Sequence, residues 1–409
     1  MAMLTEQKRS ATAQEATLAP GKCPNCLRPG MEAFYEVKNI PVHSVLLMPT
    51  RERALGYPRG NLKLGFCGGC GFVGNMLFDP TVHEYSTQCE ESQGFSPTFN
   101  KFAKDLAKRW VEQYKLEGKS VLEIGCGKGE FLALLVELGM SKGIGIDPAY
   151  IPGRLNSTAM NRLEFIQDLY SEEYTHLEAD VICCRHTLEH IAPTHGFMSM
   201  IRRTIGDRPE TLILFELPDV YRVLKEAAFW DIYYEHCTYF TTGSLARLFR
   251  STGFDVLELG LDFDDQYILL VAKPTDRPTQ SNLPLEKDLE KVRVEVASFP
   301  KRFSDVKDRW LTIINSNHSQ GKKTILWGGG SKAVSFLTTL GLGDQINCVV
   351  DINPHKHGKF IPGAGHPVVS PESLRQNPPD TVILMNPVYV KEVQAQLNSM
   401  GLTPQILPV

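Results

Sequence analysis

Residues 121–147 read VLEIGCGKGEFLALLVELGMSKGIGID, and this stretch decides the fold. The apolar run at 121–124 predicts a buried strand, and the following EFLALLVELG predicts a helix. The glycine-rich GCGKG joins these two elements, and GIGID at 143–147 predicts the next strand. A strand, a glycine turn, a helix and a further strand form one repeat of a parallel α/β sheet.

Further strand-like runs extend this alternation toward the C-terminus. A helical pattern over 99–119 comes first, and the later runs are LEFIQD (163–168), DVICC (180–184), TLILFELP (211–218), FDVLELGLDF (254–263) and YILLVAKP (267–274). We therefore predict an α/β domain over 99–274, with a parallel sheet that carries helices on both faces.

A second α/β unit follows a linker. TDRPTQSNLP (275–284) has the composition of a linker, and apolar residues then recur at steps of four and three from Leu285 to Ile313. This spacing predicts a long helix within 275–320, bent near Pro300. The runs KTILWGGGSKAVSFL, NCVVDIN, TVILMN and ILPV then predict a smaller α/β domain over 321–409.

The composition of the chain limits its class. The 409 residues include 43 Lys and Arg against 47 Asp and Glu, a formal net charge of -4. A nucleic-acid-binding protein usually carries a basic excess or a basic stripe, and the sequence has neither. Residues 1–20 are polar and lack the apolar centre of a signal peptide, and no run is long enough to cross a membrane. We predict a cytoplasmic protein with a disordered tail over 1–20, whose oligomeric state the sequence leaves open.

Four of the ten cysteines form two CxxC pairs, Cys23 with Cys26 and Cys67 with Cys70. Each pair presents two sulfurs from one tight turn, and four thiolates bind zinc tetrahedrally. Since sulfur fills all four positions, no position is left for water or substrate. We therefore predict a structural zinc in a module over 21–98. Four unrelated thiols, or a zinc ribbon that binds nucleic acid, are the alternatives.

The glycine loop and the carboxylates near it predict a cofactor that carries a ribose. Gly125 and Gly127 let the backbone pass close to a ligand, and Glu123 precedes them on the strand. Asp147 ends the next strand, where a carboxylate can accept hydrogen bonds from a ribose diol, and Asp168 ends the third strand, where it can bind an adenine amino group. NAD and S-adenosylmethionine both fit this description. The spacing E-x-G-x-G-x-G differs from the dinucleotide pattern G-x-G-x-x-G, which favours S-adenosylmethionine.

Two further groups of polar residues are candidates for catalysis. His186, Glu189 and His190 follow the fourth predicted strand, and ligands of open α/β sheets lie at such strand ends. The segment WDIYYEHCTYF (230–240) concentrates Tyr233, Glu235, His236 and Tyr239. Histidine is the usual general base near neutral pH, and a neighbouring carboxylate can raise its proton affinity. A solvated turn and an aromatic interface are the alternatives.

The C-terminal domain contains a second loop of the glycine type. WGGGSK (327–332) follows a predicted strand, and Asp351 ends the next one. The N-terminus of a helix, together with Ser331 and Lys332, could bind phosphate. A tight turn without a ligand is the alternative.

The order of these motifs resembles a known family. The chain reads CxxC…CxxC, VLEIGCGKGEFL, RHTLEHI, ELP…FWDIYYEHCTYFT and WGGGSKAVSFL…VVDINPHKHGKFIPG. This order is similar to that of the zinc-containing, S-adenosylmethionine-dependent C-methyltransferases of deoxysugar biosynthesis, from about residue 21 onward. The resemblance implies a class I methyltransferase core, Rossmann-like, between an N-terminal zinc module and a C-terminal Rossmann-like domain.

The resemblance also implies a substrate and a reaction. The family methylates a sugar nucleotide, usually a 4-keto-6-deoxyhexose on TDP, at C3. Carbon becomes a nucleophile when a base removes a proton next to the ketone, and the enolate then attacks the sulfonium methyl group.

By position in the motifs, the resemblance assigns roles to single residues. His236 would take the C3 proton, and Glu235 would assist or orient it. The sugar and enolate site would be lined by Tyr233, His190 and Tyr85. S-adenosylmethionine would be held by Glu123, Gly125, Gly127, Asp147 and Asp168. The nucleotide diphosphate would contact Ser331 and Lys332.

The chain departs from the family pattern at two places. Thr87-Gln-Cys-Glu stands where the family has a serine-rich stretch, and Met385-Asn386-Pro387 stands where a Trp-Asn pair is usual. Both lie where substrate contacts are expected, so they bear on the identity of the sugar. N- or O-methylation of another small metabolite on the same scaffold, and an NAD-dependent oxidoreductase, are the alternative functions.

Overall fold

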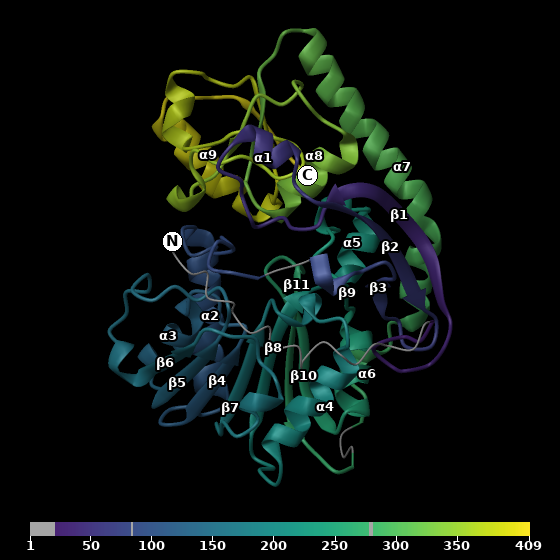
Figure 1. Ribbon diagram of the computed structural model, residues 1–409, viewed down its shortest axis with the longest axis vertical. Helices are drawn as coiled ribbons and strands as arrows, with labels where there is room; N and C mark the ends of the chain where they lie inside the picture. The colour runs from purple at the N-terminus through teal and green to yellow at the C-terminus, as the bar shows by residue number, and fades with distance from the viewer. Residues whose placement is uncertain (1–20, 83–84, 278–280) are drawn as a thin grey trace, which may run out of the picture.

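The computed structural model describes residues 21–82, 85–277 and 281–409 (Figure 1). The predicted tail over 1–20 lies outside the described residues. Strands of the described chain form three sheets, in an N-terminal module, a central α/β domain and a C-terminal α/β domain. Figure 1 shows the central domain below and the C-terminal domain above, with helix α7 (Leu289–Ser319) along one side.

Seven strands of the described chain form the central sheet, in the order β10-β11-β8-β7-β4-β5-β6. The five parallel strands are β8 (Leu212–Pro218), β7 (Val181–Arg185), β4 (Ser120–Ile124), β5 (Lys142–Ile146) and β6 (Leu163–Ile166). β11 (Tyr267–Pro274) is antiparallel to β8, and β10 (Phe254–Asp262) is antiparallel to β11. The predicted α/β, Rossmann-like core is confirmed.

The expectation of a wholly parallel sheet is wrong at one edge. Residues 263–266 join β10 to β11, whereas parallel neighbours need a crossover of a dozen or more residues. Phe263, Asp264 and Asp265 have positive φ angles, which turn the chain sharply between the two strands. Two strand-like runs this close in sequence therefore pair as an antiparallel hairpin.

Helices cover both faces of the central sheet, as predicted. They are α2 (Pro97–Gln113) and α3 (Glu130–Glu137) on one face, and α4 (Thr194–Ile205) and α6 (Thr242–Ser251) on the other. Successive residues of β8 point to opposite faces, because side chains alternate along a strand. Leu214 belongs to the core with α2 and α3, and Phe215 to the core with α4 and α6.

The first helix of the central domain shows why its bounds differ from the predicted 99–119. Ser96 caps α2, since its hydroxyl accepts a hydrogen bond from Phe99 N at 3.2 Å, and Pro97 opens the first turn. Lys115 has a φ of 53°, which is incompatible with a continued right-handed helix. The helix therefore starts earlier and ends earlier than the sequence pattern indicated.

The sheet of the N-terminal module contains a strand from a distant part of the chain. Its order is β1-β2-β3-β9. The strands are β1 (Met31–Pro41), β2 (Arg59–Cys67), β3 (Val73–Asn75) and β9 (Thr238–Tyr239), and a short helix, α1 (Arg51–Leu55), connects the first two. β9 belongs to the aromatic segment 230–240, so the module holds that segment in place through backbone pairing.

The C-terminal domain has a parallel sheet of the order β14-β13-β12-β15-β16. Its strands are β12 (Thr324–Trp327), β13 (Val349–Val350), β14 (Val368–Val369), β15 (Thr381–Leu384) and β16 (Gln405–Pro408), with helices α8 (Ser331–Leu340) and α9 (Val390–Ser399). β14 was not predicted.

Helix α7 joins the three parts into one hydrophobic core. It begins at Leu289, later than the predicted Leu285, and continues through Pro300 without interruption. Phe299 packs edge-on against Tyr35 of the module, and Trp310 packs against Phe336 of the C-terminal domain. None of the described helices combines the length and the apolar character that crossing a bilayer requires.

Candidate active site

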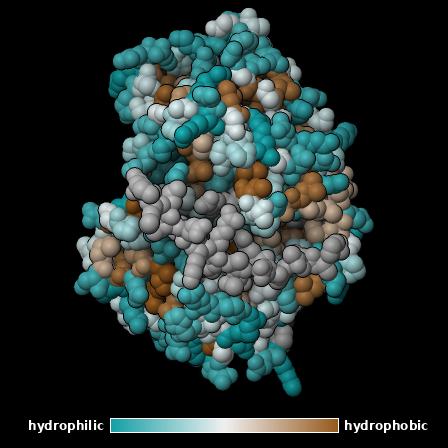
Figure 2. All heavy atoms as spheres, viewed as in Figure 1, coloured by the Kyte–Doolittle hydropathy of each residue, from teal (hydrophilic) through white to brown (hydrophobic). Residues whose placement is uncertain are grey.

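A cavity of about 1500 Å³ lies where the three parts of the chain meet. Its wall includes Asp147 and His236 of the central domain, Tyr85 of the N-terminal part and Ser331 of the C-terminal domain. Pockets for one small ligand measure ~300–1,000 Å³, so this cavity has room for a donor and an acceptor together. Figure 2 shows a mostly hydrophilic outer face with several hydrophobic residues in its middle, between the upper and lower parts.

The glycine loop, residues 125–129, joins β4 to α3 in a sharp turn. Gly125 has a φ of 73°, and a Cβ at this position would lie 1.9 Å from Thr187 Oγ1. Gly127 N donates a hydrogen bond to Asp147 Oδ2 at 2.8 Å, which ties the loop to the end of β5. Both the backbone conformation and the available space therefore require glycine at 125.

Glu123, at the end of β4, presents a buried carboxylate to the same cavity. Its Oε2 atom has no hydrogen-bond partner among the described residues. Burial raises the pKa of Glu123 to about 8, although the guanidinium of Arg185 acts in the opposite direction. The ammonium group of S-adenosylmethionine would supply the missing hydrogen-bond donor and would favour the ionised form of this buried carboxyl group. The glycine loop and Glu123 thus fit this cofactor.

Asp147 and Asp168, the predicted ligands of ribose and adenine, both line the cavity. Asp147 accepts hydrogen bonds from the backbone N–H groups of Gly127 at 2.8 Å and Ala149 at 2.7 Å, which fix its carboxylate. Asp168 accepts a hydrogen bond from the hydroxyl of Tyr174 at 2.6 Å. Each carboxylate keeps further lone pairs for a ligand, so both roles stand as predictions.

Lys128, inside the glycine loop, has a structural task that sequence reasoning missed. Its buried Nζ donates to the carbonyl oxygens of Cys89 at 2.9 Å and Ala149 at 2.7 Å, and it forms an ion pair with Glu91 at 3.2 Å. The segment that follows Tyr85 is thereby attached to the glycine loop.

His236 lies buried among aromatic rings on the cavity wall. The centroid of its ring lies 4.2 Å from that of Tyr233 and 4.7 Å from that of His190. Burial lowers the pKa of His236 to about 3, against the opposing effect of the Glu235 carboxylate. The imidazole is therefore neutral at physiological pH and can accept a proton.

Tyr85, His190 and Tyr233 line the same part of the cavity. The Tyr85 hydroxyl is hydrogen-bonded to His190 Nδ1, which also lies 3.1 Å from the backbone oxygen of Glu235. Burial raises the pKa of Tyr85 and of Tyr233 well above the usual value. Both phenols therefore stay protonated and can donate hydrogen bonds to an oxyanion.

Glu235 forms a buried ion pair with the N-terminal module. Its Oε2 atom lies 2.8 Å from His43 Nδ1 and accepts a hydrogen bond from Ser44 N at 3.1 Å. Burial alone would lower the pKa of His43, but the Glu235 carboxylate raises it to about 10. His43 is therefore protonated at neutral pH. The assistance that Glu235 was expected to give His236 stays a prediction, because these bonds direct its carboxylate to His43.

Ser331 and Lys332 begin α8 and line the cavity. The hydroxyl of Ser331 accepts a hydrogen bond from Ser44 Oγ at 2.7 Å, and Lys332 Nζ forms an ion pair with Asp231. An ammonium group has three donors, so the pair with Asp231 leaves Lys332 able to bind phosphate as well. Their contact with a diphosphate stays a prediction.

The C-terminal domain contains a hydrogen bond equivalent to the one between Gly127 N and Asp147 in the central domain. Gly329 N donates to Asp351 Oδ2 at 2.7 Å, as Gly127 N donates to Asp147 Oδ2 at 2.8 Å in the central domain. Lys356 Nζ lies 3.1 Å from the same Asp351 oxygen. Both α/β domains therefore turn glycine loops toward the shared cavity.

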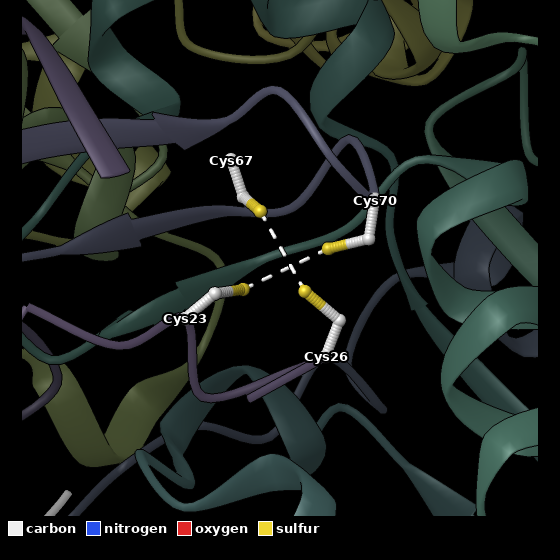
Figure 3. A group of neighbouring side chains, drawn as sticks. All are labelled: Cys23, Cys26, Cys67 and Cys70. Atoms are coloured by element: carbon white, nitrogen blue, oxygen red, sulfur yellow. Dashed lines mark hydrogen bonds between the residues drawn. The ribbon is translucent and has the colours of Figure 1, made fainter. Parts of the chain in front are cut away.

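The four cysteines of the two CxxC pairs point toward one another (Figure 3). Cys23 Sγ lies 3.7 Å from Cys70 Sγ, and Cys26 Sγ lies 3.7 Å from Cys67 Sγ. A disulfide would require ~2.05 Å, whereas a tetrahedral ion with ~2.3 Å bonds places its sulfur ligands about 3.8 Å apart. The donor set therefore fits a zinc ion with four thiolate ligands.

The turn that carries Cys23 and Cys26 also contacts the central domain. The carbonyl oxygen of Pro24 accepts hydrogen bonds from His195 N at 3.1 Å and from Thr194 Oγ1 at 3.0 Å. Arg247 Nε donates to the carbonyl oxygen of Cys70 at 2.9 Å. A bound ion would thus fix the module against α4 and α6.

Two protein families match the chain. The family described as a methyltransferase domain matches residues 98–259, and the family described as a C-methyltransferase C-terminal domain matches residues 278–403. The C-methyltransferase NovU of Streptomyces niveus is 27% identical over 290 residues, which cover 68% of this chain and 68% of that protein. The chain is an S-adenosylmethionine-dependent methyltransferase. Its core has the class I fold, and the C-terminal family and NovU together support a C-methyltransferase.

Other relatives match a smaller part of the chain. Ribosomal protein L11 methyltransferase of Histophilus somni (strain 2336) is 30% identical over 106 residues, 25% of this chain and 36% of that protein. Among solved structures, 1,6-didemethyltoxoflavin-N1-methyltransferase of Burkholderia thailandensis is 16% identical, with a TM-score of 0.32, and covers 44% of this chain and 80% of that one.

The glycine loop gives a first test of the donor site. We expect Gly125→Ala to weaken the binding of S-adenosylmethionine by at least about tenfold, because the added methyl group clashes with Thr187 and displaces the loop. Gly118→Ala is the matched control. Its φ of 74° is nearly the same as at Gly125, and nothing lies within 4 Å of the added Cβ. Calorimetric titration should show lost affinity in the first variant alone, and equal affinity in both would contradict the placement.

Proposed function

We propose that the methyltransferase transfers a methyl group to C3 of a nucleotide-linked 4-keto-6-deoxysugar. The observation that carries this proposal is the shared cavity, in which a neutral, buried His236 lies among groups that can donate hydrogen bonds to an enolate. Carbon methylation needs a base, whereas many N- and O-methylations need mainly alignment of donor and acceptor.

The proposed reaction has two balanced steps. A ring nitrogen of His236 takes the proton from C3, and the electron pair of that C–H bond forms an enolate whose negative charge lies on the C4 oxygen. Hydrogen-bond donors such as Tyr85 and Tyr233 then stabilise this oxyanion. The enolate carbon attacks the methyl group, the S–CH₃ bond breaks, and its electron pair stays on sulfur. His236 later releases the proton to solvent.

We assign the nucleotide end of the substrate to the C-terminal domain. Ser331 and Lys332 begin α8 on the cavity wall, and the helix N-terminus favours an anionic group. We further propose that the four cysteines hold a structural zinc ion. The ion would stabilise the module whose β3 strand pairs with β9 beside His236.

Hydrogen exchange at the acceptor carbon tests the proposed function without methyl transfer. The enzyme is incubated in D₂O with S-adenosylhomocysteine and a TDP-linked 4-keto-6-deoxyhexose. We expect enzyme-dependent deuterium uptake at C3, which NMR can assign to a single carbon.

The other outcomes of this experiment decide between the alternatives. The ketone also acidifies C5, so uptake at C5 alone would contradict methylation at C3. No exchange at any carbon, together with methylation of a nitrogen or oxygen acceptor in a separate reaction with S-adenosylmethionine, would replace C-methylation by the alternative function.

A further inference from the structure

Glu189 is a buried carboxylate next to His236 that the proposed reaction leaves without a task. Its side chain is 3% exposed, and its Oε2 atom has no hydrogen-bond partner among the described residues. One ligand atom each of Glu189, His190 and His236 lie within 4.8 Å of one another. A buried acceptor without a donor is costly, and a protonated imidazole would be a suitable donor.

Side chains of the segment that carries His236 bind the backbone of the turn that carries Glu189. Glu189 belongs to a short 3₁₀ turn, η4 (Leu188–His190), that follows β7. The hydroxyl of Thr238 donates to the carbonyl oxygen of Leu188 at 2.9 Å, and Cys237 Sγ lies 3.7 Å from that of Glu189. These contacts attach the turn to the segment that carries His236, so the two side chains keep their relative positions.

A second histidine holds the other oxygen of Glu189. His186 Nδ1 lies 3.6 Å from Glu189 Oε1, and His186 Nε2 lies 2.8 Å from Glu216 Oε1. Burial alone would lower the pKa of His186, but the Glu216 carboxylate raises it to about 9. A protonated His186 therefore lies between the carboxylates of Glu216 and Glu189. Its charge attracts the Oε1 atom of Glu189. The φ of 47° at His186 lies in the left-handed region, which few residues other than glycine adopt, although histidine adopts it more often than most.

We propose that Glu189 is the positioning residue that orients His236 and stabilises the imidazolium that forms when His236 takes the substrate proton. This inference rests on the proposed function, because it needs His236 to act as the base. One ring nitrogen of His236 takes the proton from C3, and the N–H of the other ring nitrogen donates to Glu189 Oε2, whose negative charge stabilises the imidazolium. Only this one proton moves to His236, and Glu189 stays ionised throughout. His236 releases the proton to solvent after methyl transfer.

Glu235 is the other carboxylate near His236, and its contacts favour Glu189 for this role. Glu235 already binds protonated His43 and the backbone N–H of Ser44. Glu189 keeps an oxygen without a partner among the described residues. The carboxylate with unfilled acceptor capacity is the one that can respond to a charge that appears during the reaction.

The test compares Glu189→Gln with Glu173→Gln, an exposed carboxylate in η3 (Glu172–Tyr174) of the same domain. Gln keeps the shape of Glu but loses the charge. We expect Glu189→Gln to lower kcat and the rate of deuterium exchange at the acceptor carbon by about 100-fold, the lower end of the range of general-base effects. The KM values and the affinity for S-adenosylhomocysteine should change by less than about threefold.

Two further measurements separate positioning from a merely structural effect. With substrate deuterated at the reacting carbon, the primary isotope effect on kcat should rise in Glu189→Gln, because proton removal becomes slower than the other steps. Glu189→Asp should recover part of the exchange rate, since it restores the charge.

Three outcomes would overturn the inference. One is deuterium exchange in Glu189→Gln at the same rate as in the unmodified enzyme, where exchange is observed. A second is an equal loss of cofactor affinity and exchange, which would show that Glu189 supports the fold of the whole site and does not act on His236 in particular. A third is a second equivalent of bound divalent metal that disappears in Glu189→Gln, which would make the three groups a metal site. Absence of exchange in the unmodified enzyme would instead refute the proposed function.

Discussion

His236→Asn should lower kcat by about 1,000-fold and leave the binding of S-adenosylmethionine within about twofold of the unmodified enzyme. Asparagine keeps a polar side chain at this buried position, but its amide cannot accept a proton at neutral pH. General-base catalysis contributes roughly 10²–10⁴ in rate, so the expected loss lies in the middle of that range. Steady-state kinetics and calorimetric titration measure the two quantities separately.

The control for this substitution is His318→Asn, at the exposed end of α7. It makes the same chemical change far from the cavity, so kcat and cofactor affinity should both stay unchanged. Turnover in His236→Asn equal to that of this control would remove His236 from the base role. The side chain at 236 would then only line the cavity.

The sequence predicts most of the central domain because its signals are local. The run VLEI, the glycines at 125 and 127 and the carboxylate at 147 fall on β4, the glycine loop and the end of β5, as expected. Each of these features depends on residues that are neighbours in the chain. A short window of sequence is enough to recognise apolar periodicity and the glycines that allow positive φ angles in a turn.

The contacts around His236 could not be predicted in this way. Glu235 pairs with His43, which lies much earlier in the chain, in the N-terminal module. β9 has only two residues, Thr238 and Tyr239, which is too short for an alternating pattern, so its pairing with β3 left no signal. Lys128 would read as a surface or phosphate-binding lysine, and only the folded chain shows that it holds the segment after Tyr85. These contacts depend on how the three parts pack together.

Replacement of one of the four proposed zinc ligands is the other change for which we expect a large effect. Cys67→Ser should abolish stoichiometric zinc binding and lower kcat by at least about 100-fold, whereas the affinity for S-adenosylmethionine should fall much less. The free energy of zinc binding at structural sites is roughly 10–16 kcal/mol. This is as large as the whole free energy of unfolding of a small domain, so loss of the ion should unfold the segments that it holds. Metal analysis, kinetics and calorimetric titration measure the three quantities.

The unequal effect on turnover and on cofactor binding follows from the sheet that the module shares with the central domain. Val73 and Gly74 of β3 pair with Tyr239 and Thr238 of β9, and Asn75 N donates to the carbonyl oxygen of Cys237 at 2.9 Å. Loss of the ion would therefore displace the backbone that directly follows His236. The glycine loop, residues 125–129, joins β4 to α3 and is tied to the end of β5, and it contains none of these residues.

Cys348→Ser in the C-terminal domain is the matched control for this change, because it removes one thiol that is not part of the cluster. It should keep its zinc and its turnover. Full activity in a zinc-free Cys67→Ser enzyme would show that the four sulfurs do not support the catalytic segment. An equal loss of cofactor affinity and turnover would show that the ion stabilises the whole chain, and that the shared β3–β9 pairing does not transmit its effect selectively to His236.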